Sequence, residues 1–371
     1  MTELRIDQLT GLPTILAPGR ADRPDSFELP KSEPKGSGNC PFCEGREERT
    51  PPEVFATRPG GGAADTPGWT TRVVPNLYPA LTQEEDGKGA DTGDRLRATA
   101  PAGATSGEAG AFASGGDPLL ASRRSGEPDL FASRPARGVH EVIVNSPAHA
   151  TTMAELDEAQ LAAAVATWRA RMRAHAEAAY VQLIVNEGGG AGASLEHSHA
   201  QLYALDFVPA AVARERERVG AYAERTAGGG LLADILVEEV RRRERLVAID
   251  AEAALICPWA SRSPFELRVV PRHAAASFAE SEAGTAMIRT ALRLLATRFD
   301  GSPELNLWVR TAPRGADHFH WHVDIAPRLS VKASFEFATG VDINTYPPER
   351  AAADLRESLS DADVSVSSSR T

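Results

Sequence analysis

Runs and alternations of apolar residues predict a protein that mixes strands with long helices. A β-branched run at 142–144 and the apolar segment 180–185 predict two strands. Between them, the segment 152–179 is dominated by leucine and alanine and predicts a long helix, which Thr152 can cap. A second, charged helix is predicted over 209–230, where a glycine triplet ends it.

The second half of the chain repeats this order of elements. The segment 246–271 predicts two or three strands, 280–300 a helix, and 305–313 and 318–327 further strands. Each half thus has paired strands, a long helix, a strand, and then a strand with alternate histidines. This parallel predicts an internally duplicated α+β fold with antiparallel sheets and helices packed on them.

These patterns divide the chain into two predicted units with two irregular segments. The expected N-terminal unit covers 1–210 and the expected C-terminal unit covers 211–355. The segment 82–137 is rich in Gly, Ala, Ser and Asp and predicts a disordered insertion, because it cannot bury enough apolar surface to offset its ordering entropy. The tail 356–371 is also expected to be disordered.

Composition and charge narrow the classes of partner. Hydrophobic residues make up 42% and charged residues 25% of the chain, as in a globular protein. The formal charge of −11 argues against nucleic acid or an anionic membrane as the main partner, because both select basic surfaces. No apolar run approaches the roughly 20 residues of a membrane span, and no signal-peptide pattern opens the chain, so a cytoplasmic location is expected.

The cysteines favour a metal site over disulfide bonds. Of three cysteines, Cys40 and Cys43 form a C-x-x-C pair, which suits a reducing compartment and a metal ion. Cys257 lies in an apolar strand and is expected to be a buried core residue.

A glycine-rich loop follows the strand 180–185 in the stretch NEGGGAGASLEHSHAQ, residues 186–201. Its glycines superficially fit a dinucleotide-binding fingerprint, but no helix opens after them, and no Lys-Ser/Thr pair completes a P-loop. Two interpretations remain open. The loop is either a flexible connection or an anion nest whose backbone N–H groups approach a phosphate.

Directly after this loop, His197, His199 and Gln201 alternate along a predicted strand. Alternate residues of a strand point to the same face, so the three side chains are expected to lie together beside the glycines. One imidazole could then be fixed in place while its neighbour meets a phosphate.

Six motifs together resemble the galactose-1-phosphate uridylyltransferase branch of the histidine-triad superfamily. They are APGRADRP, NCPFCEG, VPNLYPAL, NSPAHA, NEGGGAGASLEHSHAQ and HFHWHVDIAPRLSVKASFEFATGVDIN. The resemblance covers nearly the whole chain apart from the insertion and the tail. The usual central signature is His-Pro-His-x-Gln, whereas Ser198 stands in the place of the proline here, as in the plant ADP-glucose phosphorylase subgroup, which transfers an adenylyl group.

The resemblance implies a nucleotidyltransferase that moves a UMP or AMP group between a nucleoside-diphosphate sugar and a sugar 1-phosphate. The expected activity is that of a galactose-1-phosphate uridylyltransferase in galactose metabolism, with a phosphohistidine intermediate. One alternative is an ADP-sugar phosphorylase that uses inorganic phosphate. Another is a zinc-stabilised nucleotide-binding protein without catalysis.

The resemblance also implies roles for individual residues. His199 is the expected nucleophile, and Gln201 and Ser194 are expected to hydrogen-bond the phosphoryl oxygens. The expected substrate-binding residues are Arg20, Arg23, Asn76, Asn186, Gly190, Gly192, His320, His322, Phe335 and Glu336.

For the metal, the resemblance implies structural zinc on Cys40, Cys43, His149 and His197, with His140 as an alternative histidine. The alternating His318, His320 and His322 suggest a second metal, with Glu187 or His273 as a fourth ligand. Otherwise His320 and His322 would line the sugar-phosphate pocket or bond across a subunit interface. Relatives are often dimers with the active site near the subunit boundary, so the resemblance also implies a possible homodimer.

Overall fold

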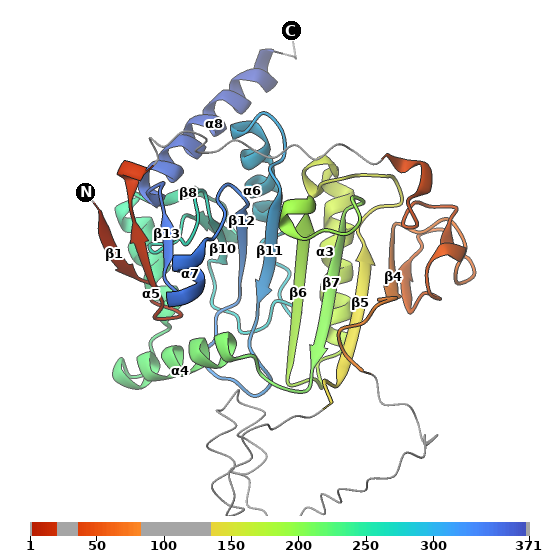
Figure 1. Ribbon diagram of the computed structural model, residues 1–371, viewed down its shortest axis with the longest axis horizontal. Helices are drawn as coiled ribbons and strands as arrows, with labels where there is room; N and C mark the ends of the chain where they lie inside the picture. The colour runs from red at the N-terminus through yellow and green to blue at the C-terminus, as the bar shows by residue number, and fades with distance from the viewer. Residues whose placement is uncertain (1, 21–35, 83–134, 369–371) are drawn as a thin grey trace, which may run out of the picture.

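The computed structural model describes residues 2–20, 36–82 and 135–368 (Figure 1). Nearly all of the expected insertion, the last three residues, and Arg23 lie outside these ranges. No helix in the described ranges has both the length and the apolar character needed to cross a bilayer.

A ten-stranded sheet, antiparallel throughout, forms the centre of the fold (Figure 1). Its strands lie side by side in the order β3 (Phe55–Thr57), β4 (Thr71–Pro75), β5 (Gly138–Val144), β7 (His199–Leu205), β6 (Tyr180–Glu187), β11 (Leu305–Arg310), β12 (His322–Pro327), β10 (Leu267–Pro271), β9 (Ala253–Ile256) and β8 (Leu246–Ile249).

From one edge inward the order is β3-β4-β5-β7-β6, and from the other edge it is β8-β9-β10-β12-β11, so the two halves have the same topology. This repeat confirms the predicted duplicated α+β fold. In each half, three strands are followed by a helix, then by the strand nearest the centre, and then by the strand that carries the histidines. The helices are α3 (Glu158–Ala174) and α6 (Thr285–Arg298). The halves meet where β6 pairs with β11, with Asn186 opposite Asn306. The two predicted units therefore share one continuous sheet.

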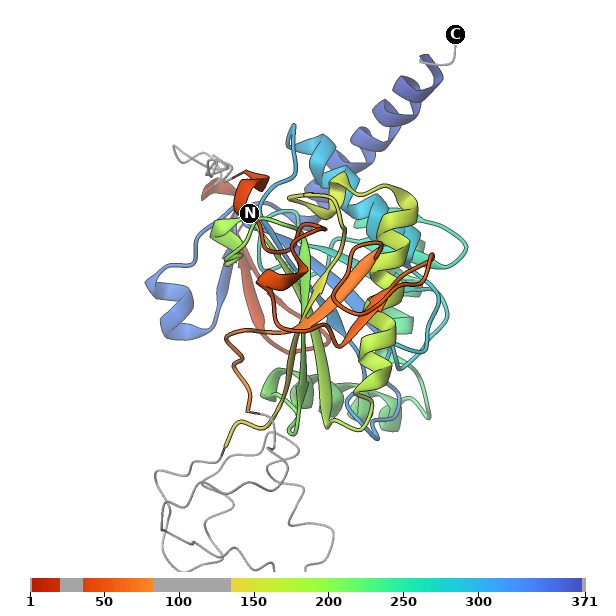
Figure 2. The ribbon, with the colours of Figure 1, turned by 90° about the vertical axis from the view of Figure 1, so that its right-hand side faces the viewer.

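One face of the sheet forms the hydrophobic core and the other is left for polar groups. Figure 2 shows α3 and α6 together on one side. Along β6, Leu183 and Val185 are fully buried toward these helices, while Ile184 and Asn186 alternate to the opposite face. The core also contains Cys257, as expected from its apolar strand.

Smaller elements cover the edges and the polar face. A three-stranded sheet of β1 (Glu3–Ile6), β2 (Pro13–Leu16) and β13 (Asp342–Asn344) joins the N-terminal segment to the C-terminal one. The remaining helices are α4 (Ala210–Arg225), α5 (Leu231–Arg242), α7 (Ser334–Thr339) and α8 (Pro348–Ser368). Short 3-10 turns are η1 (Pro18–Arg20), η2 (Ser37–Asn39), η3 (Glu47–Arg49), η5 (Met153–Glu155) and η6 (Gly189–Ala191). Helix α7 lies on the side of the sheet opposite α3 (Figure 2).

The expectation of a disordered tail from residue 356 is wrong for the described residues. Helix α8 continues to Ser368 and projects away from the sheet (Figure 1). Its first turns are anchored because Leu355 is fully buried and Leu359, one helical turn later, packs against the main core. The polar composition of the tail concealed Leu359, and Leu355 lies at the end of the preceding predicted unit.

Candidate active site and metal centre

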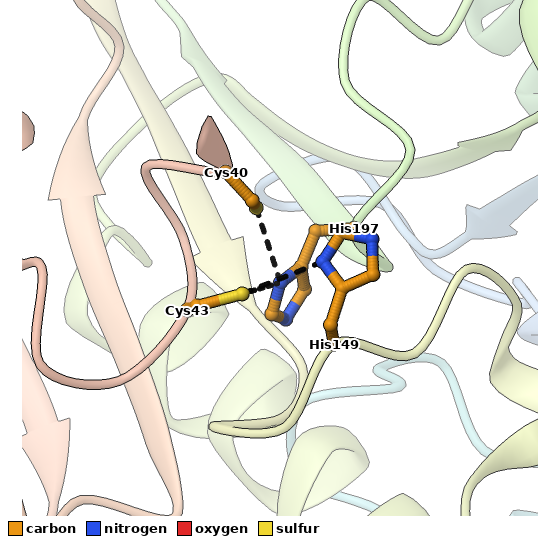
Figure 3. Close-up of side chains that lie close together, drawn as sticks. All are labelled: Cys40, Cys43, His149 and His197. Atoms are coloured by element: carbon orange, nitrogen blue, oxygen red, sulfur yellow. Dashed lines mark hydrogen bonds between the residues drawn. The ribbon is translucent and has the colours of Figure 1, made fainter. Parts of the chain in front are cut away.

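The structure brings the four expected metal ligands together. The ligand atoms of Cys40, Cys43, His149 and His197 all lie within 4.8 Å of one another (Figure 3). Sγ of Cys40 lies 3.5 Å from Nδ1 of His197, and Sγ of Cys43 lies 3.4 Å from Nδ1 of His149 and 3.7 Å from Nδ1 of His197. The ligands come from the loop before β3, the loop after β5, and the residues just before β7.

The geometry of this cluster fits a tetrahedral metal ion. Metal–sulfur bonds of about 2.3 Å and metal–nitrogen bonds of about 2.0 Å give sulfur–nitrogen separations of about 3.5 Å in a tetrahedral site. Nε2 of His197 donates to the carbonyl oxygen of Ser146 at 2.8 Å, so the lone pair of Nδ1 faces the sulfurs. Burial and the neighbouring Cys40 raise the pKa of Cys43 to about 11, so a nearby cation is needed to hold it as a thiolate. These residues could therefore bind a metal ion.

His140, the alternative ligand, lies outside the cluster. Its Nδ1 accepts a hydrogen bond from the backbone N–H of Ala80 at 3.2 Å, which leaves Nε2–H to donate to Oε1 of Gln201 at 3.1 Å. The ring also stacks on Tyr203, with centroids 4.0 Å apart. His140 thus positions Gln201.

His199, the expected nucleophile, is held by a single strong contact. Its Nδ1 lies 2.7 Å from the carbonyl oxygen of His197. A carbonyl oxygen only accepts, so Nδ1 carries the proton and Nε2 keeps its lone pair. Burial lowers the pKa of His199 below its usual value, so the ring is neutral near pH 7. The ring of Phe42 contacts both imidazoles edge-on, which shows that both lie on the same side of the sheet.

Gln201 follows two residues later on β7 and is oriented by two donors. Its Oε1 accepts from the Tyr203 hydroxyl at 2.9 Å as well as from His140. Nδ2 of Asn76 lies 3.0 Å from Nε2 of His140, which places Asn76 in the same cluster. No sequence pattern indicates the role of Tyr203, because an aromatic residue on a strand is more often part of a core.

The glycine loop does not form the open anion nest expected from its composition. The N–H of Gly190 donates to Oε2 of Glu304 at 2.8 Å, and the N–H of Gly192 donates to the carbonyl oxygen of Gly189 at 3.0 Å. A Cβ at Gly188 or at Gly190 would lie 2.2 Å from the Glu304 side chain. This close approach explains why both positions are glycine. This part of the loop packs against Glu304, and the expected phosphate contacts of Gly190 and Gly192 stay predictions.

The remaining expected residues are scattered. Ser194 is exposed at the end of the glycine loop, and Arg20 is exposed at the end of η1. Oδ1 of Asn186 accepts from Nδ2 of Asn306 at 2.8 Å on the polar face of the sheet. Phe335, on α7, is half-exposed.

A cavity of about 640 Å³ lies on the polar face of the sheet, within the size range of small-molecule sites. Glu336 lines it together with Trp308, Arg262 and Arg310. Ile184, also in the lining, pairs across the strands with Gln201 on one side and with Trp308 on the other. The cavity therefore begins next to Gln201.

The second group of histidines does not form the suggested metal site. The strand β12 begins only at His322, and His318 is exposed in a left-handed turn with φ of 60°. Among the described residues, the Cys40 cluster is the one group with metal-ligand spacing, and neither Glu187 nor His273 joins these histidines.

Buried ion pairs surround His322 instead. Arg310 lies 3.2 Å from Glu215, and Arg268 lies 2.6 Å from Asp324. His320 and His322 are both buried, and the expected sugar-phosphate contacts of these two residues stay predictions.

Comparisons with known proteins agree with this arrangement. The family model described as "Galactose-1-phosphate uridyl transferase, N-terminal domain" matches residues 115–209. An ADP-glucose phosphorylase from Arabidopsis thaliana is 27% identical over 372 residues, which are 96% of this chain and 92% of the relative. A galactose-1-phosphate uridylyltransferase from Cryptococcus neoformans is 28% identical over 66% of this chain and 71% of its own length.

A solved structure shows the same fold. The crystal structure of an ADP-glucose phosphorylase from Arabidopsis thaliana with bound ADP-glucose superposes with a TM-score of 0.72 and 25% identity, over 96% of this chain and 99% of that one. The chain is thus similar to galactose-1-phosphate uridylyltransferases and to an ADP-glucose phosphorylase over most of its length. His197, His199 and Gln201 stand in the order of the expected central signature, with Ser198 in the place of its proline, and the four expected metal ligands lie together.

His320 provides a pH-dependent contribution to the stability of this protein. Its Nε2 donates to the carbonyl oxygen of Pro271 at 2.9 Å, and its Nδ1 is buried without a partner in the described structure. Burial lowers the pKa of His320 from 6.5 to about 4. As the pH falls below 6.5, the unfolded chain takes up this proton before the folded protein does, so stability is lost as the pH falls toward 4.

We predict that the wild type loses about 2 kcal/mol more unfolding free energy than His320→Gln between pH 7 and pH 4.5. Glutamine cannot titrate, and its amide can still donate to Pro271. Urea unfolding at the two pH values measures the difference. Equal losses in both proteins would contradict the assignment.

Proposed function

We propose that this protein transfers a nucleotidyl group between a nucleoside-diphosphate sugar and a sugar 1-phosphate, through a phosphohistidine at His199. The observation that carries this proposal is the hydrogen bond between Nδ1 of His199 and the carbonyl oxygen of His197, which leaves Nε2 as a neutral nucleophile. Our leading assignment is a UDP-glucose:hexose-1-phosphate uridylyltransferase.

The reaction has two displacements at phosphorus. Nε2 of His199 attacks the α-phosphorus of the nucleotide sugar, and the bond from that phosphorus to the bridging oxygen breaks, which releases the sugar 1-phosphate. An oxygen of the acceptor phosphate then attacks the same phosphorus, and the phosphorus–nitrogen bond breaks. In the intermediate the ring is positively charged because Nδ1 keeps its proton. The carbonyl oxygen of His197 stabilises that charge.

Other residues would position the substrates. The amide of Gln201, whose oxygen is occupied by Tyr203 and His140, presents its N–H groups to the phosphoryl oxygens. The sugar would lie in the adjacent cavity beside Trp308 and Glu336. From the resemblance, we assign phosphate or ribose contacts to Ser194, Arg20, Arg23, Asn76 and Asn186.

We also propose that the metal is zinc and that it is structural. Two thiolates and two imidazoles are a common ligand set of closed zinc sites. Zinc bound there would fix His197 and thereby the carbonyl group that orients His199. Three exposed apolar side chains in one short segment, Val331, Phe335 and Phe337, support the homodimer implied by the resemblance.

A second candidate is an ADP-glucose phosphorylase, in which inorganic phosphate accepts the adenylyl group. It is favoured by the ADP-glucose phosphorylase that matches 96% of this chain. A screen with UDP-glucose and ADP-glucose as donors, and with galactose 1-phosphate and inorganic phosphate as acceptors, separates the two candidates.

We predict that the wild type becomes labelled when it is incubated with its nucleotide sugar carrying ³²P at the α-phosphorus, and that His199→Gly does not. The label is read on a denaturing gel under alkaline conditions, because phosphohistidine is acid-labile. His318→Asn is the matched control, since this histidine is exposed outside the site, and it should label normally. Absence of label on the wild type with both sugar nucleotides would favour a binding protein without catalysis.

We further predict about one zinc ion per chain in the purified protein. Cys40→Ser should lose most of the zinc and lower the thermal midpoint, because a metal bound only to the folded state stabilises it. Cys257→Ser changes a buried cysteine outside the cluster and should keep its zinc. Elemental analysis measures the content, and metal-free wild-type protein would refute this prediction.

A further inference from the structure

Two asparagine side chains meet where the two halves of the main sheet join. Asn186 on β6 lies directly opposite Asn306 on β11, and Nδ2 of Asn306 donates to Oδ1 of Asn186 at 2.8 Å. The same Nδ2 donates to the carbonyl oxygen of Ala191 at 2.8 Å, in the turn η6 of the glycine loop. One side-chain amide of the second half is therefore bonded both to a strand and to a loop of the first half.

The carbonyl group of Ala191 decides which way both amides face. A carbonyl oxygen only accepts hydrogen bonds, so the Asn306 atom beside it must be the nitrogen of the NH2 group. That nitrogen has a second hydrogen, which is donated to Asn186, so the facing atom of Asn186 must be its oxygen. A backbone carbonyl group thus sets the orientation of the Asn186 amide through Asn306.

This orientation leaves the NH2 group of Asn186 for a ligand. Within residues 2–20, 36–82 and 135–368, Nδ2 of Asn186 has no hydrogen-bond partner from the protein. Asn186 and Asn306 are both partly exposed on the polar face of the sheet, where they alternate with buried apolar residues. Asn306 also lines the cavity of about 640 Å³. An amide NH2 group only donates, so it suits an anionic oxygen beside this cavity.

The register of the sheet places Asn186 beside the expected nucleophile. On β6 and β7, Val185 pairs with Ala200, so the next residues in the same register are Asn186 and His199. Residues directly opposite each other on antiparallel strands have Cβ atoms about 4.5–5.5 Å apart and point to the same face. Asn306, Asn186 and His199 therefore form one row across β11, β6 and β7 (Figure 1).

We infer that Asn306 is a positioning residue that turns the NH2 group of Asn186 toward a phosphoryl oxygen of the donor next to His199. The second half of the chain thereby takes part in a site whose nucleophile lies in the first half. The phosphate contact of Asn186 rests on the proposed function. The arrangement of the two amides is independent of it, because the Ala191 carbonyl group fixes that arrangement.

The structural test follows the side-chain amide protons by ¹H–¹⁵N NMR on the full-length protein with labelled asparagine, with signals assigned through their bonds to the backbone. We expect both NH2 protons of Asn306 to exchange slowly with solvent, because both are donated within the protein. The NH2 signals of Asn186 should exchange faster and shift when the nucleotide sugar binds. Rapid exchange at Asn306 would overturn the inference, as would Asn186 signals that stay unmoved once the donor is bound.

The functional test is a double-mutant cycle on the second-order rate constant of ³²P labelling by the nucleotide sugar. We expect Asn186→Ala to lower this rate constant by about tenfold or more, because a hydrogen bond to a charged group is lost, and Asn306→Ala to lower it by nearly as much. Since Asn306 acts through Asn186, adding Asn306→Ala to Asn186→Ala should change the rate constant by less than about twofold.

Glu304→Ala is the matched control. It removes another hydrogen bond from the second half to the glycine loop, at Gly190, but leaves the two asparagines in place. Its effect, of whatever size, should be the same with and without Asn186→Ala. If Glu304→Ala couples to Asn186→Ala as strongly as Asn306→Ala does, general support of the loop explains the loss and the inference is wrong. Thermal midpoints show which variants fold, and the exchange test on the wild type decides if Asn306→Ala does not.

The outcomes separate failure of the inference from failure of the proposed function. Additive losses in Asn186→Ala and Asn306→Ala, with labelling still observed, would overturn the inference alone. If the wild type acquires no label, the proposed function fails, and the same cycle is measured on the Kd of the nucleotide sugar by calorimetry. Coupling of the two asparagines in that Kd would support the inference without any transfer. A wild type that binds neither UDP-glucose nor ADP-glucose would overturn both.

Discussion

The hydrogen bond from Nδ1 of His199 to the carbonyl oxygen of His197 is the contact on which the proposed nucleotidyl transfer depends. It selects one ring tautomer; in the proposed reaction it also aims the other nitrogen at the substrate and places a partial negative charge against the imidazolium. Neighbouring residues set the geometry of this bond. The candidate metal ligands Cys40, Cys43 and His149 lie against the His197 ring, and buried hydrogen bonds around Ser198 hold the backbone between the two histidines.

The second half of the protein has a similar pair of alternate histidines, but the residues that contact this pair are different. His320 and His322 repeat the arrangement of the catalytic pair: one ring bonds a carbonyl group of the adjacent strand at 2.9 Å, and the other ring faces the carbonyl oxygen of the first. The contacts around them differ, because Asp324 stands two residues after His322, where Gln201 follows His199, and it is bound to Arg268. His322 thus lies in a buried network of charged side chains, with Asp324 and Glu215 as its carboxylate neighbours.

Periodicity predicted the main strands and the long helices of both halves, because it is a local signal. The C-x-x-C pair indicated a metal site, whereas His149 and His197 came as ligands from the family resemblance. The sequence pattern misjudged the boundary of α3, which begins at Glu158 rather than after Thr152, since Asp157 accepts from the N–H of Gln160 and forms the true cap. It also failed where the cause is a long-range contact. Glu304, just before β11, contacts the glycine loop from more than a hundred residues away, and no local pattern indicates that contact.

The most direct test of this account is the atom at which the intermediate is linked. The nucleotidylated protein, trapped with its donor and digested under alkaline conditions, can be analysed by mass spectrometry to identify the modified residue and by ³¹P and ¹⁵N NMR to identify the bonded nitrogen. The structure predicts a phosphorus–nitrogen bond at Nε2 of His199, because Nδ1 is occupied by the His197 carbonyl group. A link at Nδ1, or on any other residue, would contradict the account.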